Sequence, residues 1–191
     1  MLESIQQQFN VKVKEKNILE NGESYEFMNY PQYDSETSLK IFNDYFLKDV
    51  KLTNKKKKII YEDDSEYILP IAENIHVLSD RTRFLIIFSE KPSRLSQNSE
   101  YPMFFLRPNN ATIYNADGSL RHQLIVPDDL MNQGKLGKEG WYIHSTYYAD
   151  FPHLKGFGVM VTNDHHWPAL CFCLYDGTPN LVWTRYQQER R

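Results

Sequence analysis

Residues 112–126 read TIYNADGSLRHQLIV, and this stretch decides the fold. Two runs rich in β-branched, aromatic and aliphatic residues flank the sequence Asn115-Ala116-Asp117-Gly118. Gly118 can adopt the positive φ that a tight hairpin needs, whereas a residue with a side chain is strained there. The stretch therefore predicts two antiparallel strands joined by a short turn.

Similar patterns recur through the rest of the chain. Asp176-Gly177-Thr178-Pro179-Asn180 is a second turn of this kind. Short apolar or alternating runs, which are typical of strands, occur at 67–71, 75–78, 84–88, 103–106, 112–114, 120–126, 141–148, 157–162, 170–175 and 181–186. The C-terminal two-thirds of the chain is therefore predicted to form a curved antiparallel sheet, a meander of hairpins.

The N-terminal third contains the best helix signal. Asp34 or Ser35 can cap a helix, and the apolar residues Leu39, Phe42, Phe46 and Val50 follow at spacings of three or four. A helix with this stripe packed on a sheet is expected. The four lysines at 55–58 are interpreted as a solvated loop before a short strand at 59–61. The prediction is an α+β fold with one or two helices in the N-terminal third, forming a single domain over residues 1–191.

Composition restricts the classes of function. The chain has 191 residues, 41% of them hydrophobic and 25% charged, which is typical of one folded domain. A net charge of −3 gives no general attraction to nucleic acid or anionic lipid, so neither partner is expected. The N-terminus lacks a signal-peptide pattern and no apolar run is long enough to span a bilayer, so a cytoplasmic protein is predicted. Cys171 and Cys173, two apart on a predicted strand, are expected to be buried and reduced.

Catalytic chemistry finds little support in the sequence. No phosphate-binding loop, nucleophile elbow or dinucleotide fingerprint is present, and no cofactor is expected. Imidazole and carboxylate side chains are the ligands of zinc and iron sites, and four of them form the alternative metal site: His144, His153, Asp164 and His165. Their spacing matches no known metal signature. A metal-dependent hydrolase therefore remains an alternative, as does a small-ligand module that stacks its ligand on Tyr and Trp side chains.

An acidic run offers a different kind of site. Glu62, Asp63, Asp64 and Glu66 follow the predicted strand at 59–61. Such a run is commonly a solvated turn, but clustered carboxylates can also imitate a nucleic acid and dock on a basic protein surface. These four residues are the predicted partner-binding residues.

The hairpin at 113–121, followed by Leu124-Ile125-Val126-Pro127, resembles hairpins of small bacterial immunity proteins that protect a cell from polymorphic or contact-dependent growth inhibition toxins. The resemblance implies a cytoplasmic, non-catalytic protein that binds one toxin domain, such as a basic nuclease domain, and blocks it. It assigns no role to any single residue. A protein-binding inhibitor is therefore the leading hypothesis.

Overall fold

A computed structural model describes residues 10–28, 32–33, 35–48, 50–69, 73–91, 104–132, 139–147, 155–164 and 169–189. By contacts within the chain, the residues divide into two compact units. The first comprises residues 1–84, 92–102 and 115–119, and the second comprises residues 85–91, 103–114 and 120–191. The chain passes between the units several times, and the single domain over residues 1–191 stays a prediction.

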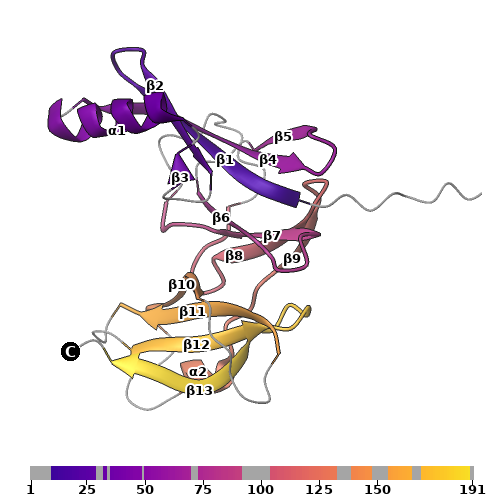
Figure 1. Ribbon diagram of the computed structural model, residues 1–191. Helices are drawn as coiled ribbons and strands as arrows, with labels where there is room; N and C mark the ends of the chain where they lie inside the picture. The colour runs from indigo at the N-terminus through magenta and orange to yellow at the C-terminus, as the bar shows by residue number, and fades with distance from the viewer. Residues whose placement is uncertain are drawn as a thin grey trace, which may run out of the picture. The chain divides into compact units, whose positions relative to one another are not determined.

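A five-stranded antiparallel sheet forms the body of the first unit (Figure 1). Its order is β3-β2-β1-β4-β5, with bounds Gln32–Tyr33, Ser24–Met28, Asn10–Leu19, Leu52–Tyr61 and Glu66–Leu69. Strand β1 is ten residues long, and β2 and β3 were not predicted. The polar N-terminal third is thus mostly sheet.

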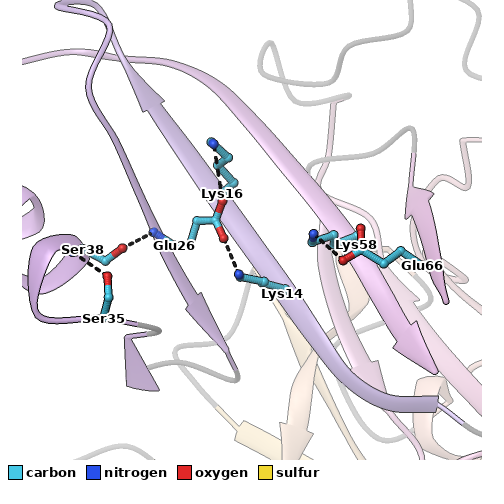
Figure 2. Close-up of polar contacts among 7 residues, drawn as sticks. All are labelled: Lys14, Lys16, Glu26, Ser35, Ser38, Lys58 and Glu66. Carbon is cyan, nitrogen blue, oxygen red and sulfur yellow. Dashed lines mark hydrogen bonds and ion pairs between the residues drawn. The ribbon is translucent and has the colours of Figure 1, made fainter. Parts of the chain in front are cut away.

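Helix α1 (Glu36–Lys48) packs mainly against β2 of this sheet. Ser35 is the cap, since its Oγ accepts a hydrogen bond from the Ser38 N–H at 3.1 Å. The Ser38 Oγ in turn accepts a hydrogen bond from the backbone N–H of Glu26 at 3.0 Å, so this backbone donor of β2 has a partner in α1 (Figure 2). The predicted apolar stripe is only partly right: Leu39 is 43% exposed, and the buried position next to it is Ser38.

The interpretation of the four lysines as a solvated loop was wrong, because residues 55–58 lie inside β4. Side chains alternate between the two faces of a strand. Lys55 and Lys57 therefore share a face with Glu15 of β1, while Lys58 lies on the other face opposite Lys14. Figure 2 shows that second face, where Glu26 pairs with Lys14 and Lys16 and where Glu66 pairs with Lys58.

A second sheet has the order β6-β7-β8-β9 and contains the predicted central hairpin. Its strands are Asn74–Val77, Arg83–Ile87, Ala111–Asn115 and Leu120–Gln123. The Asn115 N–H donates to the Ser119 carbonyl at 2.9 Å, and Gly118 has a φ of 81°. The hairpin and the reason given for its glycine are therefore confirmed.

The third sheet lies in the second unit and has the order β10-β11-β12-β13. Its strands are Trp141–Tyr147, Phe157–Asn163, Ala169–Tyr175 and Val182–Glu189, and the short helix α2 spans Asp128–Met131. Cys171 and Cys173 are buried free thiols, as expected. Residues 104–106 were predicted to belong to a strand, but they do not form one.

The chain is mainly antiparallel β-structure, which confirms the sheet prediction. Helix α1 lies in the N-terminal third as expected, whereas α2 lies outside it. Among the described residues, no helix combines the length and the apolar character that crossing a membrane would require.

Thr112 of β8 supplies the first testable prediction. Its side chain is fully buried, and its hydroxyl has no hydrogen-bond partner among the described residues. Because a buried polar group without a partner costs about 1 to 3 kcal/mol, the Thr112→Val variant should raise the free energy of unfolding by about 1 kcal/mol. All three tryptophans belong to the second unit with Thr112, so urea unfolding followed by tryptophan fluorescence measures the change.

The same substitution at Thr184 is the control. Its hydroxyl donates to the Phe172 carbonyl at 2.7 Å, so Thr184→Val should lower stability by about 1 kcal/mol. Two destabilising effects of equal size would contradict the assignment of Thr112.

Candidate functional site

The acidic run forms the turn between β4 and β5. The Asp63 carboxylate accepts hydrogen bonds from both the backbone N–H and the hydroxyl of Ser65, the N–H at 3.0 Å. Asp64 has a φ of 60°, a left-handed conformation that aspartate tolerates better than most residues. The carboxylate of Asp63 thus fixes the turn, and the remaining acidic side chains project from it, all of them exposed.

Two further turns of the first unit repeat this arrangement. In the β6–β7 turn, Asp80 accepts from the Thr82 N–H at 3.0 Å. In the β8–β9 turn, Asp117 accepts from the Ser119 N–H at 2.9 Å and from its hydroxyl at 2.6 Å. Each turn therefore has aspartate two residues before Ser or Thr, with positive φ at the residue between.

The three turns are joined directly to one another. Arg81 of the β6–β7 turn forms an ion pair with Glu62 of the β4–β5 turn at 2.6 Å. The Ala116 N–H of the β8–β9 turn donates to the Thr82 carbonyl at 3.0 Å, and the buried Tyr61 hydroxyl donates to the Ala116 carbonyl. We call the resulting group of carboxylates the acidic turn surface: Glu62, Asp63, Asp64, Glu66, Asp80 and Asp117.

Cations offset only part of this negative charge. Glu62, Asp80 and Glu66 pair with Arg81, Arg83 and Lys58 respectively. Hydrogen bonds from Ser65 and Ser119 lower the pKa of Asp63 and the pKa of Asp117, so both stay ionised at neutral pH. The side chain of Asp64 makes no ion pair or hydrogen bond with any residue that the structure describes. The surface as a whole is therefore negative.

All four predicted partner-binding residues lie on the acidic turn surface. Asp80 and Asp117 join them and were missed, although the spacing of aspartate and Ser or Thr in their turns is visible in the sequence. That spacing marks each turn, but the convergence of the turns depends on strand pairing between distant segments. The binding role of the surface stays a prediction.

The alternative metal site is only partly described. His153 and His165 lie outside the described residues. His144 is an exposed residue of β10, and Asp164 follows β11, where its N–H donates to the Gly140 carbonyl at 3.0 Å. Asp164 therefore lies beside Gly140, and Gly140 is four residues before His144 in the chain. At the usual rise of a strand this places the backbones of Asp164 and His144 about 13 Å apart. Arg107 pairs with Asp164 and stacks 3.8 Å over the Tyr142 ring that lies next to His144.

Within the described ranges, no group of three or more His, Cys, Asp or Glu side chains could hold a metal ion. The stacking alternative is likewise only partly described, since Trp167 lies outside those ranges. Trp183 already has the Arg185 guanidinium 4.4 Å over its ring, and Arg185 is paired with Asp129 at 2.5 Å. One face of the Trp183 ring is therefore engaged within the protein.

A second charged cluster, which surrounds the buried Lys57, was not predicted. Lys57, 4% exposed, lies 3.1 Å from the Glu15 carboxylate and donates to the Glu73 carbonyl. Burial lowers the pKa of Lys57, and burial together with the charge of Lys57 lowers the pKa of His76 to about 4. Burial alone would raise the pKa of Glu15, but Lys57 and Lys55 lower it. Lys57 at its centre is buried and held by Glu15 and by the Glu73 carbonyl, so we interpret the cluster as structural.

No protein-family model, curated protein or solved structure matches this chain.

Proposed function

We propose that this chain is a single-domain α+β protein of the cytoplasm that binds a basic protein domain and inhibits it, as immunity proteins do in bacterial contact-dependent growth inhibition. The observation that supports the proposal is the convergence of three hairpin turns into the acidic turn surface. Each turn is fixed by its own aspartate, so the backbone that carries the carboxylates is positioned before a partner arrives. A preorganised surface loses less conformational entropy on binding.

The geometry suits electrostatic recognition of a cationic surface. Opposite charges on two proteins accelerate their encounter and fix their relative register. A toxin domain that degrades nucleic acid has to present cationic side chains to phosphates, and a row of carboxylates can cover the same side chains. In this proposal inhibition needs no chemistry from the inhibitor, only occupation of the surface where the substrate binds.

Neutralising the surface tests this proposal. The triple variant Glu62→Gln, Asp64→Asn and Glu66→Gln keeps side-chain size, and Asn suits the left-handed φ at residue 64. We expect its association rate constant for the toxin domain encoded beside its gene to fall about tenfold at low salt, because electrostatic steering is lost. The difference from the wild type should shrink at 1 M salt, where the Debye length is about 3 Å.

A second triple variant is the control: Glu20→Gln, Glu23→Gln and Glu36→Gln. These exposed residues of the first unit lie outside the acidic turn surface, and the variant has the same net charge as the test variant. Stopped-flow binding measures the rates, and survival of cells that co-express the toxin domain measures protection. Equal loss in both variants would show that net charge alone acts, and absence of any binding by the wild type would refute the proposed function.

A further inference from the structure

We propose that the partner's contact includes an extended segment that adds to the sheet of the first unit as a new strand beside β5. This inference rests on the proposed function and specifies how the partner binds. Strand β5 is the last strand of its sheet, and among the described residues its strand pairing is with β4 alone (Figure 1). An edge strand of this kind offers unpaired backbone donors and acceptors to an extended chain.

The register identifies which backbone groups of β5 point outward. The turn is closed by the Tyr61 N–H bonded to the Ser65 carbonyl at 3.0 Å. Because hydrogen-bonded and non-hydrogen-bonded pairs alternate in antiparallel ladders, Ile59–Tyr67 bonds across the ladder and Lys58–Ile68 does not. Glu66 and Ile68 therefore direct their N–H and C=O groups away from β4, toward the open edge.

The side chains at the same positions describe the incoming strand. Ile68 is 65% exposed, an unusual position for an isoleucine, and it offers apolar contact. Glu66 lies two residues away on the same face and is half-exposed despite its pair with Lys58. The acidic turn surface continues beyond it through Asp64.

These features favour one occupant, an extended segment with an apolar residue opposite Ile68 and a basic residue opposite Glu66. Asp64 lies in the turn just before β5, so a second basic side chain placed beyond the first would suit its carboxylate. Opposite charges directly across a ladder stabilise the pair, whereas like charges destabilise it. A second copy of β5 would bring glutamate instead of a base, so charge favours a different protein.

A short peptide tests the strand addition without the partner. The probe is Thr-Thr-Val-Thr-Lys-Thr-Lys-Thr, in which valine would lie opposite Ile68 and the first lysine opposite Glu66, with the second lysine next to the turn that carries Asp64. Titrated into the full chain, it should shift the amide signals of β5 in NMR spectra and slow hydrogen exchange of the Glu66 amide. The same peptide with glutamate in place of lysine should bind at least tenfold more weakly. Absence of shifts in β5, or equal binding of both peptides, would overturn the inference.

Two substitutions separate the backbone of Ile68 from its side chain. Ile68→Pro removes the outward N–H along with the isoleucine side chain, a change that a sheet edge permits, and should weaken peptide binding at least tenfold. Ile68→Thr keeps the N–H and should bind within about threefold of the wild type. If the proline variant does not fold, the wild-type chain is tested instead with a peptide that is N-methylated at valine, which removes the N–H that faces β5. The control is a peptide N-methylated at the following threonine, whose N–H points away from β5. Equal binding of each pair would contradict strand addition.

The toxin domain distinguishes this inference from the proposed function. Wild-type binding of the toxin domain with no difference between Ile68→Pro and Ile68→Thr would overturn the strand addition and leave the proposed function standing. Peptide binding at β5 without any toxin binding would refute the function but support an open, basic-selective edge. Sedimentation that shows a dimer lost only in Ile68→Pro would assign the edge to a second copy and overturn the inference.

Discussion

Replacing Asn110 by alanine is expected to lower the free energy of unfolding of the second unit by about 4 kcal/mol. The Asn110 side chain is buried, and its amide donates to the carbonyls of Phe88 and Ile143 at 2.6 and 3.0 Å. Its oxygen accepts from the Ile143 N–H at 2.8 Å. Truncation leaves these backbone groups without partners in the interior, and each such group costs about 1 to 3 kcal/mol. Urea unfolding followed by tryptophan fluorescence measures the loss.

Two neighbouring or similar asparagines provide graded controls. Asn109 accepts from one backbone group, the Val126 N–H at 2.9 Å, so Asn109→Ala should cost about 1 kcal/mol. Asn180 is exposed, and Asn180→Ala should change stability by less than about 0.5 kcal/mol. A loss at Asn110 no larger than the loss at Asn109 would show that the unit does not depend on this side chain.

His76 is expected to make the first unit less stable in mild acid. Burial and the nearby Lys57 lower its pKa to about 4 in the folded protein, against 6.5 for an ordinary histidine. Between pH 6.5 and 4 the imidazole is protonated in the unfolded chain but not in the folded protein. The contribution of His76 to the free energy of unfolding is therefore fully present above pH 6.5 and falls as the pH approaches 4. The loss over that window is about 3 kcal/mol, since each pKa unit corresponds to about 1.4 kcal/mol.

The variant His76→Asn removes this titration. Its unfolding by denaturant is measured at a series of pH values, with hydrogen exchange of amides in β1 and β4 as the readout for the first unit. Between pH 6.5 and 4, the free energy of unfolding should change less with pH in the variant than in the wild type. The tryptophan fluorescence transition of the second unit, which has all three tryptophans, is the internal control and should be the same in both proteins. Identical slopes for β1 and β4 would contradict the assignment to His76.

The strands of the C-terminal two-thirds were predictable because their signals are local. Alternating apolar residues mark most of them, and Gly118 marks the central turn. The segment at 104–106 misled because apolar composition alone does not make a strand. Strands β1, β2 and β4 were missed or shortened because lysine and glutamate occupy their positions, and these residues satisfy one another across the ladder.

The acidic site was half predictable for a related reason. Four carboxylates are contiguous in sequence, but Asp80 and Asp117 lie far from them along the chain and reach them through the contacts of Arg81 and Ala116. Nothing in the sequence of any one turn indicates which other turn it will meet.

The sequence by itself determined most strands of the C-terminal two-thirds, the central turn and the net charge, because backbone preference and side-chain alternation act between residues close along the chain. Only the tertiary structure decided that three turns form one acidic surface, that Lys57 is buried beside Glu15, and that β5 is the last strand of its sheet among the described residues. These outcomes depend on which distant strands pair. That choice is set by the summed burial and hydrogen bonding of the whole sheet, so no single segment shows it.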